Sequence, residues 1–192
     1  MKKLVYTLIT LMILAVFLVG CTTVVPETDL SRKGPNGQAG NSNIAHLYLY
    51  EKTPGPIAVP PIPWDLVEGG AWGKMKYNLS GEEFEYVFNG HGLVEGEDYT
   101  LIYYPDKIGN PWPRVDIICL GSGIANAKLN VHIMGSVDTG DLPDPLVDIN
   151  EGAKIWLVLS DDVDCGTKIM TGWNPTEYLF EGDVITFDDT DV

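Results

Sequence analysis

The sequence predicts an all-β protein: an antiparallel β-sandwich of about eight or nine strands, with a barrel as the second choice. Short apolar or alternating runs recur from His46 onward, and Gly, Pro, Asn and Asp separate them. Aromatic and β-branched residues dominate these runs, as they do in strands generally. No segment after the N-terminal region carries the 3.6-residue apolar stripe of an amphipathic helix, so a helical bundle is excluded.

The expected strands follow one another at short intervals along the chain. Their ranges are 46–52, 71–79, 83–90, 98–104, 115–121, 129–137, 154–160 and 177–187, the last as one strand or as two that meet at 181–183. A proline-rich loop at 53–63 follows the first strand, and Ser80-Gly81-Glu82 is a hairpin signal. Phe84, Tyr86 and Phe88 alternate with Glu83, Glu85 and Val87, which predicts three aromatic rings on one face.

The first 20 residues have the features of an export signal. Two lysines precede an apolar run from Leu4 to Val19, which is short for a membrane span of about 20 residues. The run ends in the sequence LVGC at 18–21, which resembles the lipobox of prokaryotic lipoprotein precursors. The resemblance implies cleavage before Cys21 and lipid on its sulfur, so that the protein is held outside the cytoplasm at the cell membrane. An ordinary secretory signal and an uncleaved anchor are the alternatives.

The remaining cysteines predict a disulfide. Outside the cytoplasm, two thiols in one domain usually pair, and Cys119 and Cys165 each lie near the end of an expected strand. A reactive thiol needs positive charge or a base beside it, whereas Cys165 follows three aspartates. We therefore expect a Cys119–Cys165 bond and no cysteine nucleophile.

The charge of the chain limits its partners. Loss of residues 1–20 removes two lysines and no acid, which leaves ten Lys and Arg against 27 Asp and Glu, a formal net charge of −17. Nucleic acid repels such a chain, so no nucleic-acid partner is expected. Residues 22–43 are rich in Thr, Gly, Asn and Pro and predict a flexible tether. The expected plan is a signal peptide at 1–20, the lipidated cysteine with its tether at 21–43, and one β-sandwich domain at 44–192.

Several stretches of the domain resemble uncharacterised secreted or surface proteins of methanogenic archaea. They are GHGL, DYTLIYYPD, ICLGSG, VHIMGSV and KIWLVLSDDVDC, and the resemblance covers about residues 70–192. It implies a surface protein, and it transfers neither an activity nor a functional residue.

Catalytic motifs are missing from the sequence. No serine lies in a Gly-x-Ser-x-Gly frame, and His46, His91 and His132 have no zinc-type spacing. Calcium is the one candidate cofactor, because Asp161, Asp162 and Asp164 cluster in a loop and calcium prefers oxygen ligands. The alternative is a solvated acidic loop in an acidic protein.

Tryptophans beside prolines are the candidate ligand-binding residues. Trp64, Trp112 and Trp173 lie in loop sequences, and a ring on a rigid loop can stack on a sugar. They can instead plug the ends of the core, as is expected of Trp72 and Trp156 in strands.

Three functions remain open on the sequence. The first is a membrane-anchored, surface-exposed lipoprotein with a non-enzymatic binding or structural role in the cell envelope, whose partners are glycans or envelope proteins. The alternative is a carbohydrate-binding module that uses the loop tryptophans, with or without calcium. The third is an extracellular hydrolase whose carboxylates meet only in the fold.

Overall fold

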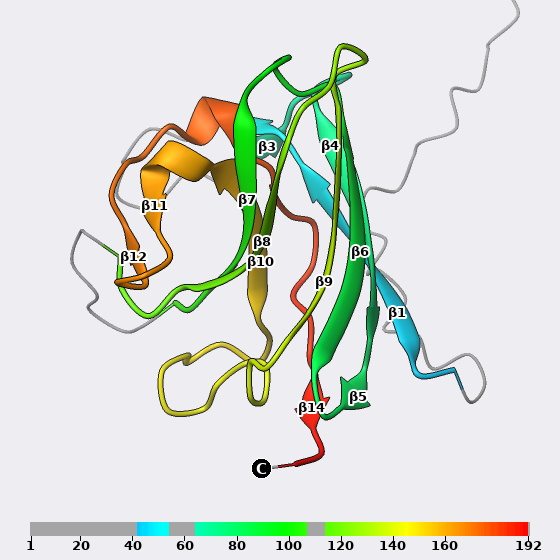
Figure 1. Cartoon of the computed structure of the whole chain (residues 1–192), viewed down its shortest axis with the longest axis vertical. Coiled ribbons are helices and arrows are strands. Elements are labelled where there is room, and N and C mark those ends of the chain that lie inside the picture. Colours follow the sequence, from blue (N-terminus) through cyan, green and yellow to red (C-terminus); the bar gives the residue numbers. More distant parts are fainter. Residues whose placement is uncertain (1–41, 54–63, 107–113, 192) are drawn as a thin grey trace, which may run out of the picture. The chain divides into compact units, whose positions relative to one another are not determined.

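The computed structural model describes residues 42–53, 64–106 and 114–191, and the fold is all-β, as predicted (Figure 1). The strands of the two main sheets are β1 (Ile44–Tyr50), β4 (Trp72–Asn78), β6 (Phe84–His91), β7 (Asp98–Tyr104), β8 (Ile118–Ile124), β9 (Asn130–Val137), β10 (Lys154–Leu159) and the short edge strand β13 (Phe180–Glu181). The short elements are β2 (Lys52–Thr53), β3 (Asp65–Leu66), β5 (Ser80–Gly81), β11 (Val163–Asp164), β12 (Ile169–Met170), β14 (Asp188–Asp189) and the 3-10 turns η1 (Ser160–Asp162) and η2 (Pro175–Glu177). None of these helical turns has the length and apolar character that crossing a membrane requires.

The larger sheet has five strands in the order β13-β1-β4-β6-β9, all antiparallel. Its strands alternate between buried and exposed residues because one face packs on the core and the other meets solvent. Phe84, Tyr86 and Phe88 are all buried on the core face, which confirms the predicted row of aromatic rings.

The smaller sheet has three antiparallel strands in the order β10-β7-β8. Its inner face joins the large sheet in one core, where Leu101 and Ile155 share a cluster with Leu47 and Phe88. This stacking of two sheets is the predicted sandwich, and the described strands do not close into a barrel. Tyr86 marks the close approach of the layers, because a Cβ on Gly121 would lie 2.6 Å from its hydroxyl oxygen.

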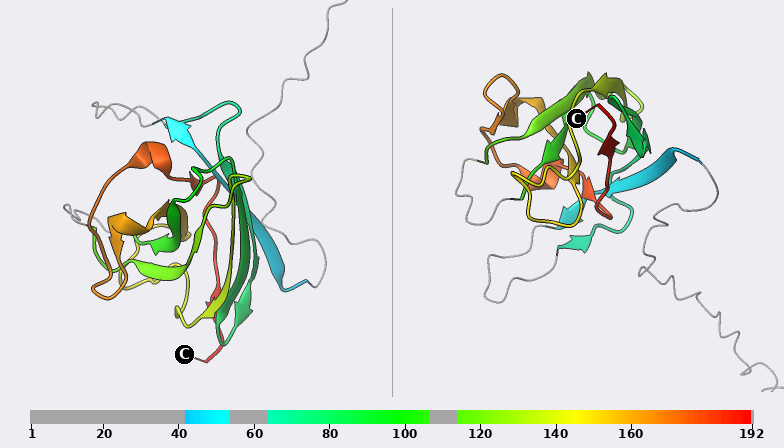
Figure 2. Two further views of the ribbon diagram at one scale, coloured as in Figure 1. Left: turned by 45° about the horizontal axis from the view of Figure 1, so that its top comes forward. Right: turned by 90° about the horizontal axis from the view of Figure 1, so that it is seen from below.

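The outer face of the small sheet is also buried. Ile102, Tyr104, Trp156 and Val158 point away from the main core and form a second cluster. Residues 160–180 cover them, and Figure 2 shows this segment and the large sheet on opposite sides of β7 and β10. Consecutive residues of β7 and β10 are therefore buried, in contrast to the alternation seen in the large sheet.

The disulfide ties the covering segment to the small sheet. Cys119 of β8 and Cys165, between β11 and β12, are bonded, with their Cα atoms 5.7 Å apart. The bond predicted from the number and positions of the cysteines is confirmed.

Trp72 corrects one expectation about the core. Its ring is 41% exposed on the outer face of the large sheet, opposite Tyr50 on one side and His91 on the other. The expectation of a core position was wrong because the adjacent Gly73 faces inward, and the ring of Phe88 fills the space beside it. Trp156, by contrast, is buried as expected.

Candidate functional site

Residues 160–180 are held over the small sheet by a buried aspartate. Asp162 is 6% exposed, and its two carboxylate oxygens accept hydrogen bonds from Asn174 Nδ2 at 3.0 and 2.8 Å. The hydroxyl of Tyr178 donates to the same carboxylate at 2.5 Å. Hydrogen bonds to an ionised group are stronger than neutral ones, so this cluster fixes the turn that carries Trp173.

The same bonds bear on the calcium hypothesis. Asp162 is already engaged by two side chains, Asp161 is exposed, and Asp164 accepts from the main-chain N–H groups of Gly166 and Thr167 at 2.9 and 3.1 Å. Across the described ranges, no three His, Cys, Asp or Glu side chains are grouped so that they could hold a metal ion. The calcium site therefore stays a prediction from sequence that no cluster of ligands supports.

A pocket of about 710 Å³ opens beside the covering segment, and aromatic rings form its walls. The rings belong to Trp64, Tyr104, Trp156, Trp173 and Phe180. Tyr104 and Trp156 stack with their ring centroids 3.8 Å apart. Trp64 and Phe180 pack edge to face, with their ring centroids 4.8 Å apart. Trp64 and Trp173 approach to 5.9 Å with their planes tilted by 53°.

The five rings differ in how much of them a ligand could reach. Tyr104, Trp156 and Phe180 are each less than a tenth exposed and belong to the second core. Trp173 is 41% exposed and Trp64 is partly exposed. The buried rings therefore support the pocket, and the two outer indoles present surface at its mouth.

Two of the three predicted tryptophans thus meet in one place. Trp64 precedes β3 and Trp173 precedes η2, and the fold brings them together from distant parts of the chain. They form a tilted pair, not a coplanar platform. Trp112 lies outside the described residues.

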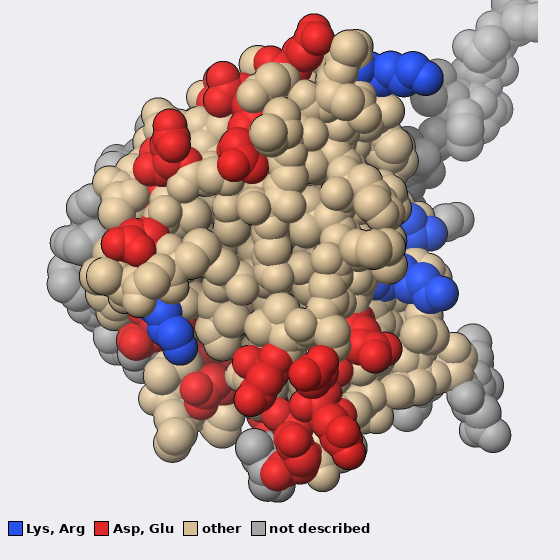
Figure 3. Space-filling view, in the orientation of Figure 1, with Lys and Arg blue, Asp and Glu red and all other residues tan. Residues whose placement is uncertain are grey.

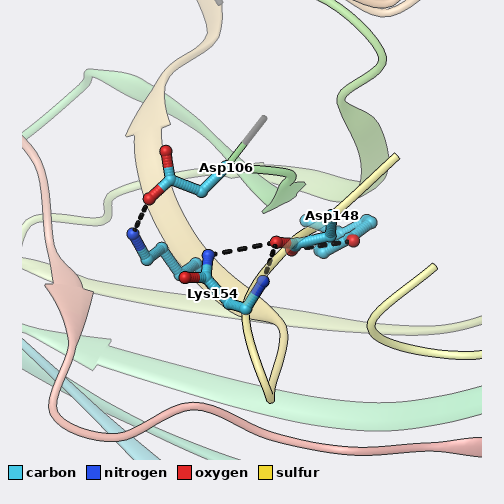
Figure 4. A network of polar contacts seen from close by, with 5 residues as sticks. Asp106, Asp148 and Lys154 are labelled. Atoms are coloured by element: carbon cyan, nitrogen blue, oxygen red, sulfur yellow. Dashed lines mark hydrogen bonds and ion pairs between the residues drawn. The ribbon is translucent and has the colours of Figure 1, made fainter. Parts of the chain in front are cut away.

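A lysine–aspartate pair borders the pocket. Lys154 opens β10, Asp106 follows β7, and the lysine Nζ contacts Asp106 Oδ2 in a short ion pair (Figure 4). Burial alone would raise the pKa of Asp106, but the hydrogen bond and charge of Lys154 outweigh it and hold that pKa below its ordinary value. Asp106 is therefore ionised at neutral pH, and its charge is balanced by its partner.

Two further cations line the pocket. Lys52 Nζ donates a hydrogen bond of 2.7 Å to the main-chain oxygen of Glu181, and burial lowers the pKa of this lysine. Arg114 lies with its guanidinium carbon 5.8 Å from the ring centre of Tyr104, within the range of a cation–π contact.

Glu181 is the second acid of the pocket, and it is deeply placed. Burial raises its pKa above the ordinary value, although a main-chain hydrogen bond and the charges of Lys52 and Lys154 act against the shift. The indole N–H of Trp156 also favours the carboxylate, but within the described part of the chain neither Trp156 Nε1 nor Glu181 Oε2 has a partner at hydrogen-bond geometry. Loss of water outweighs the partial compensation, so protonation of Glu181 is easier than for a carboxyl in solution.

The histidines lie outside the pocket. His46, His91 and His132 all belong to the large sheet, and none lines the cavity. His91 Nδ1 is 3.0 Å from Asn130 Oδ1, and His132 Nδ1 is 2.8 Å from Asn89 Oδ1. His91 and Asn130 are opposite one another on β6 and β9, as are Asn89 and His132, so both histidines make cross-strand contacts.

The charged residues of the pocket and its deep rings were not anticipated from the sequence. Lys52, Asp106, Lys154 and Glu181 have no spacing that singles them out. One signal was available: residues 155–159 are all apolar, which indicates a strand covered on both faces and hence a segment lying over it. Comparison of the chain with known protein families, curated proteins and solved structures found no match, so a function must be argued from the pocket itself.

Proposed function

We propose that the protein is a membrane-anchored, surface-exposed lipoprotein whose β-sandwich binds carbohydrate without transforming it. The observation that carries the proposal is the pocket with two partly exposed indoles at its mouth. Small-molecule sites are concave, mostly apolar and bordered by a few polar groups, and they measure roughly 300–1,000 Å³. A pocket of about 710 Å³ falls in this range.

The chemistry of the walls favours a sugar over a wholly apolar ligand. A pyranose has apolar C–H faces that stack on Trp64 and Trp173, and hydroxyl edges that need hydrogen-bonding groups. Asp106, Lys154 and Lys52 supply such groups at the border of the same pocket. A wholly apolar ligand would remove water from these charged groups without supplying hydrogen bonds in its place, which costs free energy.

Anchoring and location rest on the sequence alone. The signal, the lipobox and Cys21 lie outside the described residues, and so does the proposed tether up to residue 41. The proposal combines them with the pocket because a module held at a surface by a flexible chain can reach glycans around the cell.

A hydrolase is the second candidate, and one observation favours it. Asp106 and Glu181 line the same pocket, and their pKa values are shifted in opposite directions. Pairs of carboxyls whose environments separate their pKa values are typical of acid and nucleophile roles. Against it, Glu181 Oε2 is closed off from solvent, and Asp106 is engaged by Lys154.

A glycan array with the full chain in detergent tests the main proposal. We expect at least one glycan to bind, and Trp173→Ala to abolish the signal. Trp72→Ala is the matched control, because Trp72 is also 41% exposed but does not line the pocket. Silence of the wild-type chain on the array, or equal loss in both variants, would contradict the proposal. A chelator arm shows whether calcium takes part.

A separate assay distinguishes the hydrolase. Glycans that bind are incubated with the protein, and their reducing ends are counted. Release of reducing ends that Glu181→Gln abolishes, while binding persists, would replace the binding module with an enzyme.

A further inference from the structure

The outer face of the large sheet, which points away from the core, differs in charge from the rest of the molecule. The chain carries 27 acids and 12 Lys and Arg. Figure 3 shows acidic side chains crowded at the end of the domain near the C-terminus, and basic side chains on the side where β1 lies. Apart from histidines, the charged residues of β1, β4, β6 and β9 are Lys74, Lys76 and Glu85. Cations therefore outnumber acids on this face of a strongly acidic chain.

Strand register places the two lysines beside one another. Lys74 and Lys76 alternate with buried residues of β4, and on β1 they are opposite Tyr48 and His46. Lys74 Nζ lies 5.3 Å from the ring centre of Tyr48. Burial lowers the pKa of His46, and the charges of both lysines lower it further, so the two cations act at one place. Within the described part of the chain, neither lysine forms an ion pair.

Rings and apolar side chains extend over the width of the same face. Tyr48 and Trp72 are each 41% exposed, and the ring planes of Tyr48 and Tyr50 differ by 15°. Ile44 on β1 and Met134 on β9 are exposed as well. The order β1-β4-β6-β9 separates these two strands by three spacings of about 4.8 Å each. A single sugar chain follows one line, so side chains spread this widely suit a flat partner.

This composition is that of a surface in contact with lipid headgroups. Tyrosine and tryptophan concentrate at membrane–water interfaces, because each has an apolar ring and a polar atom. Lysine places its apolar stem along such a surface while its ammonium reaches the headgroups. Each lysine near an anionic bilayer raises the binding constant about fivefold, so two raise it about 30-fold.

The acidic end of the domain does not cancel this attraction. Its strand β14, with Asp188 and Asp189, pairs with β5 beyond the end of β4. A strand rises about 3.3 Å for each residue, so Lys74 lies roughly 20 Å from Ser80 of β5. Salt screens exposed charges over about 8 Å at physiological ionic strength. A bilayer over Lys74 therefore feels little repulsion from the acids of that end.

The chain enters the domain through this sheet. β1 begins at Ile44, directly after the predicted tether of residues 22–43. A flexible chain of that length has an average end-to-end distance of about 25 Å, so an anchored domain would stay close to the bilayer and dock intramolecularly. The pocket walls Tyr104 and Trp156 belong to the outer side of the small sheet, across the sandwich. Contact through the large sheet would thus turn the pocket away from the lipid.

We propose that the outer face of the large sheet docks on a bilayer that contains anionic lipid. Tyr48 and Trp72 then lie at the level of the headgroups, and Lys74 and Lys76 contact the lipid phosphates. The docking rests on the anchor of the proposed function, and it adds a second contact, between the folded domain and the lipid, that presents the pocket to glycans around the cell.

Quenching of tryptophan fluorescence by brominated lipid tests the docking. The full chain is reconstituted through its anchor into vesicles of brominated phosphatidylcholine, either alone or mixed two to one with phosphatidylglycerol. Every tryptophan of the sequence lies between positions 64 and 173, so quenching reports the domain and not the anchor. We expect stronger quenching in the anionic vesicles, and we expect the difference to disappear at high salt.

Paired lysine variants locate the contact. Lys74→Gln combined with Lys76→Gln should lower the ratio of docked to undocked protein on anionic vesicles about 30-fold. The matched control is Lys128→Gln combined with Lys168→Gln, because both of these lysines are exposed and lie in turns outside the face. The control should dock like the wild type.

Two tryptophan variants identify the side that meets the lipid. Trp72→Phe should remove most of the quenching, whereas Trp173→Phe should retain it, although both rings are 41% exposed. The opposite result would place the mouth of the pocket against the bilayer and overturn the docking face.

The remaining outcomes separate the docking from the proposed function. Equal quenching in both vesicles, quenching that survives in the Lys74 and Lys76 variant, or equal loss in its control overturns the docking and leaves sugar binding in the pocket in place. A chain that does not float with either vesicle overturns the anchor as well. Binding of dextran sulfate that the Lys74 and Lys76 substitutions abolish, without quenching by anionic vesicles, overturns the lipid and assigns the face to an acidic polysaccharide.

Discussion

Loss of a tyrosine hydroxyl measures how much the hydrogen bonds to Asp162 stabilise the fold. The same change, Tyr to Phe, is made at Tyr178, which contacts Asp162, and at Tyr86, which does not. Tyr178→Phe removes a hydroxyl that donates to Asp162 at 2.5 Å and accepts from the main-chain N–H of Asn174 at 3.0 Å. A hydrogen bond to a charged group contributes about 1.5–3 kcal/mol, and a neutral one about 1 kcal/mol. We therefore expect the free energy of unfolding to fall by about 3 kcal/mol. For a domain of this size the melting temperature should fall by roughly 6–12 °C.

Tyr86→Phe is the control, and we expect it to leave the free energy of unfolding nearly unchanged or to raise it. Tyr86 is buried like Tyr178, but its hydroxyl has no hydrogen-bond partner among the described residues, and burial raises its pKa to about 12. Removing an unsatisfied buried hydroxyl recovers its desolvation cost, which offsets the small void left between Gly121 and Gly135. We expect stability within about 1 kcal/mol of the wild type, or higher.

Urea unfolding of both variants, followed by tryptophan fluorescence at equal protein concentration, compares them directly. The slope of free energy against urea should be the same in all three proteins, so that midpoints report stability alone. Equal destabilisation by the two substitutions, or a larger loss in Tyr86→Phe, would refute the argument that hydrogen-bond satisfaction at Asp162 holds the covering segment in place.

Three further predictions concern the anchor, the disulfide and the lysine–aspartate pair. Cys21→Ser should move the protein from the detergent phase to the aqueous phase in a partitioning assay, and unchanged partitioning would count against lipidation. Replacement of Cys119 and Cys165 by alanine should lower stability by about 4 kcal/mol, since the closed loop spans 46 residues, and calorimetry showing no loss would contradict this. Asp106 has a folded-state pKa below its unfolded value, so its contribution is present above the unfolded pKa and is lost as the pH falls through the folded one. The stability difference between the wild type and Lys154→Met should therefore shrink between about pH 6 and pH 2, and a constant difference would show that the ion pair is not its cause.

Much of the fold was predictable because strand periodicity is local. The alternation of Phe84, Tyr86 and Phe88 required only that one side of a strand be buried, and the structure has that side in the core. The Cys119–Cys165 bond was predictable for a different reason, since the sequence predicts export, and the two cysteines that follow Cys21 offer one pairing.

Which face of each strand is buried was harder to predict from the sequence. Trp72 and Trp156 both lie in strands, yet the first is exposed and the second is buried beneath residues 160–180. Periodicity assigns residues to two faces of a strand, but it does not say which faces a second layer will cover. That depends on contacts between distant segments.

By itself, then, the sequence determined the all-β class, most strand positions, the disulfide and the strongly acidic composition. Only the tertiary structure decided the pocket. Trp64, Glu181 and Lys52 meet there because β2 pairs with β3 and β13 pairs with β1. Trp173 joins them because Asp162 fixes its turn. Such a site forms from contacts between residues far apart in the sequence. These contacts depend on strand register and on the order of the layers, and the local pattern of apolar and polar residues specifies neither of the two.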